Sequence, residues 1–232
     1  NDIAALEAAI NENTCAVIIE PIQGESGILP ATQEYLQAAR RLCDGHGALL
    51  ILDEVQTGMG HTGKLFAYEH YGITPDILSS AKALGGGFPI GAILTTDKIA
   101  PTFGPGTHGS TFGGNPMACA VGSRAFDIIN APETLVHVEK QGQKFQTTLR
   151  GLGEKTGVFK EVRGMGLLIG CVLADQYQGR ASEITAAALK HGLMVLVAGA
   201  DVVRLAPSLL LNDEDMAEGL ERLEAALTEW LV

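Results

Sequence analysis

The chain has 232 residues, a formal net charge of −11, and 46% hydrophobic against 19% charged residues. This length buries one full core or two smaller ones, and the apolar content excludes a disordered tail. The negative charge argues against an electrostatic nucleic-acid binder. The apolar runs, such as 48–52 and 193–200, are much shorter than the ~18 residues of a membrane span, so we expect a soluble protein.

The cysteines and glycines set further limits. The four cysteines lie far apart without a C-x-x-C pair, which predicts reduced thiols, no metal site and a cytoplasmic location. The 29 glycines are about an eighth of the 232 residues, well above the usual ~7%, and indicate that several segments need unusual backbone conformations. The chain begins at Asn1 without a signal-peptide pattern, and we expect that an N-terminal part is missing.

The first half of the sequence alternates helical periodicity with short, wholly apolar runs. Such runs are typical of buried parallel strands, and their alternation with helices predicts a sheet covered by helices on both faces. The expected helices are 2–13, 32–43 and 115–130, and the expected strands are 15–19, 48–52, 76–79 and 91–95.

After Pro132 the pattern changes, which indicates a domain boundary. The expected helices of the second half are 133–149, 182–191 and 213–230, and the expected strands are 159–162, 167–173, 194–197 and 202–205. Asn212 or Asp213 is the expected N-cap of the last helix. The sequence therefore predicts an α/β chain in which 1–131 form part of a large cofactor-binding domain and 132–232 a smaller α+β domain.

Polar residues that directly follow the apolar runs are the first candidates for a site, because ligands of open α/β sheets collect beyond the carboxyl ends of strands. These residues are Glu20, Asp53 and Glu54. Asp53 ends a wholly apolar run, where a carboxylate must be paired or solvated to stay charged. It is either a functional carboxylate or a helix cap or strand-end ion pair.

Lys82 follows another predicted strand and is surrounded by small residues, with three glycines at 85–87. Taken alone, it is better explained as a solvated loop lysine, as most lysines are. Together with Asp53 it provides the two groups that pyridoxal phosphate needs. The lysine forms a Schiff base, and the carboxylate keeps the pyridinium nitrogen protonated. The pair therefore indicates pyridoxal phosphate as the cofactor.

A glycine-rich run at 106–116 precedes a predicted helix and offers backbone amides and the hydroxyls of Ser110 and Thr111. Loops of this kind cradle phosphate, although glycines at positive φ explain a simple turn equally well. His108 has no second ligand at metal spacing, so we expect no metal there.

At these residues the sequence resembles the class III, fold-type I aminotransferases, and among them those of arginine metabolism that act on acetylornithine or succinylornithine. The resemblance runs through six ordered motifs: EPIQGE at 20–25, LDEVQTG at 52–58, SAKALGGG at 80–87, GSTFGGNP at 109–116, RGMGL at 163–167 and VRLAP at 203–207. It implies transfer of the ω-amino group of an N-acylornithine to 2-oxoglutarate, giving a semialdehyde and glutamate.

The resemblance also implies roles for single residues around the cofactor. Lys82 binds it covalently and then acts as general base and acid, while Asp53 pairs with its ring nitrogen. Val55 packs on the ring, and Gln56 lies near its phenolic oxygen. Ser110 and Thr111 belong to the phosphate-binding loop, and Thr111 reaches the phosphate of the neighbouring subunit, which makes the active unit a homodimer.

Glu20 and Arg204 correspond to a gate in this family. The glutamate holds the arginine while the ω-amino substrate reacts, and then releases it to bind the α-carboxylate of 2-oxoglutarate or glutamate.

Two departures from the family pattern affect this interpretation. His61 stands where relatives usually carry arginine, which affects any ion pair made there. Relatives also have a long N-terminal portion with another phosphate-binding loop, an aromatic ring that stacks on the cofactor and an arginine for the substrate carboxylate. We therefore expect this chain to be the C-terminal part of such an enzyme. The alternatives are another ω-amine aminotransferase, such as one for 4-aminobutyrate, or an inactive fragment that acts only at a dimer interface.

Overall fold

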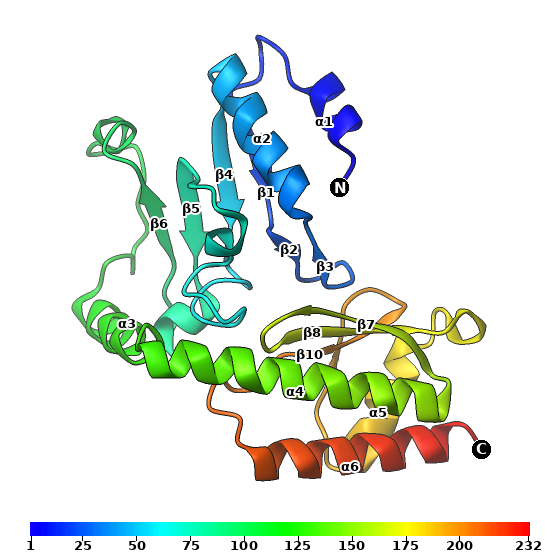
Figure 1. The fold of residues 1–232 in the computed structure, drawn as a ribbon. Helices are drawn as coiled ribbons and strands as arrows, with labels where there is room; N and C mark the ends of the chain where they lie inside the picture. The colour runs from blue at the N-terminus through cyan, green and yellow to red at the C-terminus, as the bar shows by residue number, and fades with distance from the viewer. The chain divides into compact units, whose positions relative to one another are not determined.

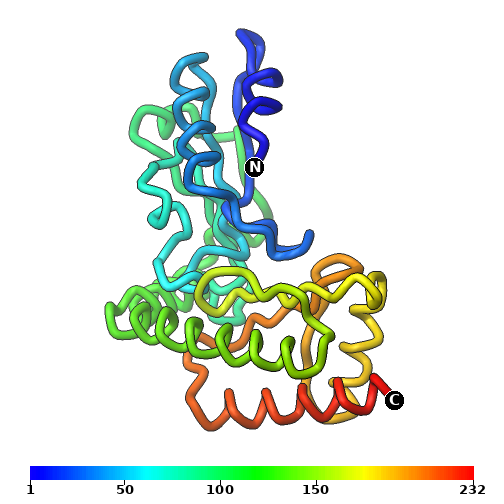
Figure 2. Tube along the Cα trace, turned by 45° about the vertical axis from the view of Figure 1, so that its right-hand side comes forward, coloured from blue at the N-terminus to red at the C-terminus, as the bar shows by residue number.

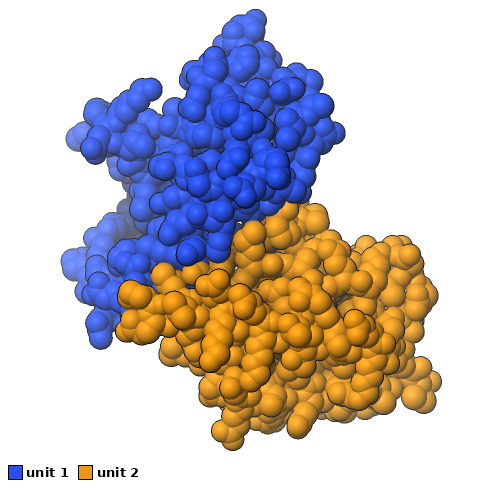
Figure 3. Space-filling view, in the orientation of Figure 1, with its two compact units in different colours: residues 1–21, 31–60, 64–131 blue, residues 22–30, 61–63, 132–232 orange.

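The computed structural model describes all residues, 1–232. The chain forms two compact units, shown in separate colours in Figure 3. Unit 1 comprises 1–21, 31–60 and 64–131, and unit 2 comprises 22–30, 61–63 and 132–232. Two short segments of the first half thus belong to unit 2. The assignment of 1–131 and 132–232 as functional domains stays a prediction.

Unit 1 is built on a four-stranded sheet in the order β1–β4–β5–β6. Its strands are β1 (Ala16–Ile19), β4 (Leu49–Asp53), β5 (Ile77–Ser80) and β6 (Ala92–Thr95). β1, β4 and β5 are parallel, and β6 runs antiparallel to β5. The register of β4 and β5 pairs Asp53 with Ser79. Both residues therefore lie at the carboxyl edge of the parallel strands, where ligands of such sheets collect.

The helices of unit 1 begin at capping side chains that the sequence supplies. They are α1 (Ile3–Ala9), α2 (Gln33–His46) and α3 (Pro116–Ile129), with the short 3-10 helices η1 (Ala67–Tyr71), η2 (Lys82–Gly85) and η3 (Ala100–Thr102). Asp2, Thr32 and Asn115 each accept a hydrogen bond from a backbone N–H in the first turn. α1 ends before the expected Asn13, because Asn11 and Asn13 form a side-chain turn that competes with the helix.

One face of the unit 1 sheet is packed and the other is open. Leu50, Leu52 and Leu78 point to the packed face and are at most 4% exposed. The register places Ile18 and Ile93 on the opposite face, where they are 69% and 63% exposed. The expectation of helices on both faces is therefore not met within these residues. The connections after β4 and β5 contain only short 3-10 helices, which cannot cover a sheet face.

Unit 2 contains a four-stranded antiparallel sheet in the order β7–β8–β10–β9, and a separate two-stranded β2–β3 hairpin. The strands are β2 (Ile22–Gln23), β3 (Leu29–Pro30), β7 (Phe159–Met165), β8 (Leu168–Leu173), β9 (Leu196–Val197) and β10 (Val202–Leu205). The helices are α4 (Pro132–Thr156), α5 (Ala181–Lys190) and α6 (Asp213–Trp230), with the 3-10 helix η4 (Asp175–Tyr177). α4 and α6 lie side by side in Figures 1 and 2. None of the helices in the chain has the length and apolar content needed to cross a membrane.

Every residue of β8 is buried, because both faces of this strand are covered. Ile169 and Cys171 belong to the core formed with α4, α5 and α6. Leu168 packs with Ile22 and Ile28 of the hairpin segment. This second contact places 22–30 in unit 2, and the sequence pattern did not indicate β2 or β3.

α4 is longer than its periodicity predicts, since it continues past Leu149 to Thr156. Leu152 and Gly153 are buried in this last part. A Cβ on Gly153 would lie 2.8 Å from the carbonyl oxygen of Phe159, so only glycine allows the helix to approach β7 so closely. Packing on the sheet therefore extends the helix through glycines that disfavour helix in isolation. The predicted N-cap of α6 is confirmed as Asn212.

Candidate functional site

Asp53 is the last residue of β4, and its hydrogen bonds go to one carboxylate oxygen. Oδ1 accepts from the backbone N–H of Val55 at 3.0 Å and from the hydroxyl of Ser79 at 3.0 Å. The Ser79 hydroxyl comes from the neighbouring strand, directly opposite in the register. Oδ2 is thereby left for a ligand beyond the strand ends.

Lys82 begins η2 shortly after β5, and its backbone lies in the left-handed region with φ 43°. This conformation is uncommon outside glycine, and such strain concentrates at functional sites. The side chain is exposed and lines a hollow of about 280 Å³ together with residues 87–90. Because β4 and β5 are parallel neighbours, Asp53 and Lys82 leave the sheet at the same edge.

Glu54 organises the loop that follows β4. It is 1% exposed, and its Oε2 accepts from Thr57 Oγ1 and from the backbone N–H of Ala67, both at 2.7 Å. Its Oε1 accepts from the backbone N–H of Tyr68 at 2.8 Å. Burial raises the pKa of Glu54, and the three hydrogen bonds oppose that shift. These hydrogen bonds join the start of the loop to Ala67 and Tyr68 at its end. Val55 and Gln56, the residues that follow Glu54, are thereby held beside Asp53.

Ser110 and Thr111 are exposed and lie between η3 and α3, in a segment without helix or strand. Asn115 ends this segment: its side chain accepts from the backbone N–H of Ala118 at 2.9 Å and donates to the carbonyl of Phe112 at 2.9 Å. The side chain of Phe112 is 82% exposed. The glycine-rich run thus meets α3 in a fixed turn and presents its hydroxyls at the surface.

Arg204 of β10 forms an ion pair with a glutamate that sequence reasoning did not select. Its Nη1 lies 2.7 Å from Glu25 Oε1 and donates to the carbonyl of Gly24 at 3.1 Å. The arginine side chain is 11% exposed and the glutamate 67%. Glu25 stands in the same motif as Glu20, and motif spacing does not tell which carboxylate faces β10. Glu20 directly follows β1 in unit 1, and its pairing with Arg204 stays a prediction.

A second arginine, Arg163 of β7, holds the hairpin that carries Glu25. Its Nε donates to the carbonyls of Gly27 at 2.9 Å and Ile28 at 3.1 Å, and its Nη2 donates to Gly27 at 2.7 Å. Gly27 and Ile28 have positive φ, 99° and 48°, and Ile28 is fully buried. The two arginines therefore fix the backbone of a strained loop.

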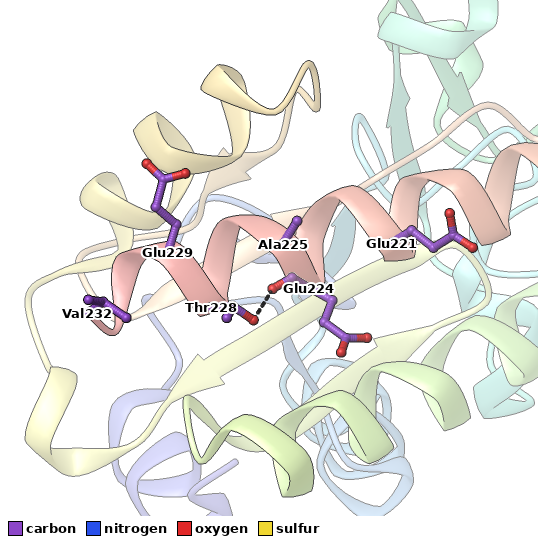
Figure 4. Close-up of a pocket in the computed structure, with 6 residues that line it drawn as sticks. All are labelled: Glu221, Glu224, Ala225, Thr228, Glu229 and Val232. Carbon is purple, nitrogen blue, oxygen red and sulfur yellow. Dashed lines mark hydrogen bonds between the residues drawn. The ribbon is translucent and has the colours of Figure 1, made fainter.

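A larger hollow of about 750 Å³ lies along α6, and none of the predicted site residues lines it (Figure 4). Its lining is acidic, with Glu221, Glu224 and Glu229. Thr228 Oγ1 donates to the carbonyl of Glu224 at 2.8 Å, so this hydroxyl is used within the helix. Figure 4 shows the labelled side chains spread along one helix face, which is the arrangement of a solvated surface.

The family described as "Aminotransferase class-III" matches residues 1–227. The chain belongs to the class III aminotransferases. "Acetylornithine aminotransferase" from Neisseria meningitidis serogroup B is 82% identical over 230 residues, which are 99% of this chain and 58% of the relative. "Succinylornithine transaminase/acetylornithine aminotransferase" from Pseudomonas aeruginosa is 57% identical over 229 residues, which are 99% of this chain and 56% of that relative.

A solved structure of this class III family has the same fold. N-acetylornithine aminotransferase from Stenotrophomonas maltophilia matches with a TM-score of 0.92 at 44% identity, over 99% of this chain and 61% of that chain. The predicted fold class, aminotransferase fold type I, is confirmed. The chain spans a little over half the length of the curated relatives that it matches.

Proposed function

We propose that this chain is the lysine-bearing part of a pyridoxal-phosphate aminotransferase that moves the ω-amino group of an N-acylornithine to 2-oxoglutarate. The observation that carries the proposal is the shared strand edge, where Asp53 has one uncommitted carboxylate oxygen and Lys82 has a strained backbone. The names of relatives that are 82% and 57% identical to this chain support the substrate class. Family membership supports the reaction type.

The residues at this edge fit pyridoxal phosphate. Asp53 Oδ1 is occupied by two donors, so Oδ2 can accept from a protonated ring nitrogen. Lys82 is exposed on a hollow and free of a protein ion pair, as a group that bonds covalently to an aldehyde must be. When bound, pyridoxal phosphate supplies an electron sink for the pair left when the substrate carbon loses its proton.

Asp53 and Lys82 then have different tasks in the reaction. The Asp53 carboxylate holds a proton at the ring nitrogen and so keeps a positive charge where electron density arrives. With the cofactor bound, Lys82 Nζ would hold it covalently and, once the donor amine has replaced the lysine, would act as the base and acid that moves the proton of the substrate carbon. Val55 and Gln56 orient the ring from the loop that Glu54 closes.

The gate of this proposal uses the observed ion pair. Arg204 binds the α-carboxylate of 2-oxoglutarate or glutamate in one half-reaction. In the other half-reaction Glu25 neutralises Arg204, so that a largely buried cation does not draw the α-carboxylate of the acylornithine into the wrong position. The 2.7 Å contact supports Glu25 as a partner of Arg204 in this role, beside Glu20, to which the resemblance assigned it.

The proposed active unit is a cytoplasmic homodimer. The exposed hydroxyls of Ser110 and Thr111 are suited to a phosphate bound by a neighbouring subunit, and the adjacent Phe112 offers exposed apolar surface for that contact. The four cysteines are free, as expected in a reducing compartment.

Borohydride reduction of the full-length protein with bound cofactor, followed by peptide mapping, tests the proposal. We expect the label on Lys82, and we expect spectroscopic conversion of the cofactor by acetylornithine or succinylornithine in preference to 4-aminobutyrate. A label on another lysine would overturn the assignment of the site. Conversion by 4-aminobutyrate alone would replace the proposed substrate class.

A further inference from the structure

The orientation of the Asp53 carboxylate depends on two donors of different kinds. The torsion that turns a carboxylate has a broad, two-fold profile, so the side chain needs partners to hold one oxygen outward. Val55 supplies a backbone N–H, which any residue there except proline would supply. Ser79 supplies a hydroxyl at 3.0 Å, and this donor exists only because a hydroxyl residue stands at that register position.

The next residue, Ser80, provides an internal comparison. Neighbouring residues of a strand point to opposite faces, so Ser80 lies on the packed face while Ser79 shares a face with Asp53. Ser80 is 2% exposed, and its hydroxyl has no hydrogen-bond partner in the structure. Two adjacent serines thus have the same side chain but different surroundings, and only one contacts Asp53.

We propose that Ser79 is a positioning residue that holds Asp53 with Oδ2 directed at the ring nitrogen of the cofactor. This inference rests on the proposed function. A hydroxyl that donates to an ionised carboxylate makes a charge-assisted hydrogen bond, which is stronger than a neutral one. Ser79 also belongs to β5, the strand that leads to Lys82. Its hydrogen bond therefore links β5 to Asp53 at the end of β4.

Without the hydroxyl, Val55 still binds one oxygen of Asp53, but the carboxylate turns more freely. The ring nitrogen is then paired in a smaller fraction of molecules, which slows proton removal more than it weakens cofactor binding. The test uses the full-length holoenzyme with Ser79→Ala, Ser79→Thr and Ser80→Ala. It measures kcat and KM for the acylornithine half-reaction, the Kd of pyridoxal phosphate, and the absorption of the bound cofactor across pH.

For Ser79→Ala we expect a fall in kcat of about tenfold, equivalent to roughly 1.4 kcal/mol, with KM changed much less. The absorption of the bound cofactor should change its pH dependence in the same variant. Ser79→Thr keeps the hydroxyl and should restore both readouts. Ser80→Ala should match the unmodified enzyme, because it removes a hydroxyl without a partner.

The proposal is overturned if Ser79→Ala and Ser80→Ala have the same kcat and the same cofactor spectrum. It is also overturned if Ser79→Ala only lowers the melting temperature while the spectrum is unchanged, since that is the result of a structural role. Ser79→Cys keeps the volume with a weak donor and replaces Ser79→Ala if the latter does not fold. Failure of the proposed function looks different: the borohydride label then lies on a lysine other than Lys82 in the unmodified enzyme.

Discussion

The carboxyl edge of β4 and β5 and the β2–β3 hairpin hold their polar side chains by different means. At the strand edge, Asp53 accepts hydrogen bonds from Val55, two positions later in the chain, and from Ser79, 26 positions later. In the hairpin, Glu25 accepts a hydrogen bond from Arg204, which lies 179 positions later in the chain. Gly27 accepts one from Arg163, which lies 136 positions later. The edge is built within consecutive strands, whereas the hairpin depends on strands that come much later in the chain. The first arrangement can be inferred from motifs, and the second requires the sheet of unit 2.

The largest effect is expected at the strand edge. Lys82→Ala in the full-length protein should reduce turnover to background, because the group that bonds to the cofactor and moves the proton is lost. Steady-state kinetics and the cofactor spectrum check this, with Lys98→Ala as the matched control. Substantial turnover in Lys82→Ala would mean that the edge is not the reaction centre.

Asp53→Asn tests the second group at the edge. The amide keeps the shape but loses the charge that holds the ring proton, so kcat should fall by on the order of 10³-fold. Cofactor affinity should change much less. Single-turnover rates with equilibrium binding of pyridoxal phosphate separate the two effects. Unchanged single-turnover rates would leave Asp53 with a structural role only.

Two glycines of α4 test how strictly unit 2 depends on close packing. A Cβ on Gly142 would lie 2.3 Å from the carbonyl oxygen of Gly166, in the turn between β7 and β8, whereas a Cβ on Gly151 would meet nothing within 4 Å. Gly142→Ala should lower the free energy of unfolding by about 3 kcal/mol. Gly151→Ala should raise it by up to ~1 kcal/mol through helix propensity. Thermal unfolding of both variants checks this, and equal shifts would contradict the close approach.

The gate gives a smaller, selective effect. Arg204→Ala should slow the 2-oxoglutarate half-reaction roughly tenfold more than the acylornithine half-reaction, since a charge-assisted hydrogen bond is worth about 1.5–3 kcal/mol. Glu25→Gln should remove the charge that neutralises Arg204 and let glutamate compete better with the ω-amine donor.

Glu20→Gln is the matched control for the gate, because it alters the other carboxylate of the same motif. We expect separate half-reaction kinetics to show the change of preference in Glu25→Gln, and Glu20→Gln measures what the other carboxylate contributes to it. The reverse result would return the gate to Glu20, and parallel losses in all three variants would reduce the ion pair to a stabilising contact.

The smallest effect concerns pH. Burial raises the pKa of Glu54 above its value of about 4.5 in the unfolded chain, so the folded state binds this proton more tightly. The resulting stabilisation is fully present below the unfolded pKa and is lost as pH rises through the folded pKa. The Tm difference between the unmodified protein and Glu54→Gln should therefore favour the unmodified protein more at low pH than at neutral pH. A constant difference across this range would contradict the raised pKa.

The interpretation from sequence was most successful where chemistry and local pattern coincide. The wholly apolar runs became β1 and β4, the predicted strand 76–79 became β5, and the residues that end these strands stand at one edge because parallel pairing aligns carboxyl ends. The capping residues Thr32, Asn115 and Asn212 could be expected from the same local logic. The roles of Lys82 and Asp53 in catalysis stay proposals, since the structure supports them by geometry alone.

Other features could not be inferred from local pattern. The segment 22–30 joins unit 2 because Ile22 and Ile28 are buried against β8, a contact between residues that are remote in sequence. In the sequence, Glu54 could not be distinguished from other carboxylates at strand ends. Its three hydrogen-bond partners depend on the path of the loop that follows it. α4 continued to Thr156 because β7 covers its last turns.

The sequence by itself determined the strands of the two four-stranded sheets, the helix starts, the family and the candidate residues, because these depend on side-chain periodicity, capping and motif identity within short stretches. Only the tertiary structure decided that Arg204 pairs with Glu25, that Ser79 and not Ser80 contacts Asp53, and that Ile18 and Ile93 share the exposed face of the unit 1 sheet. Each of these depends on strand register or on the path of a loop. A shift of one residue in register turns every side chain of a strand to the other face, and only packing between distant segments selects the register.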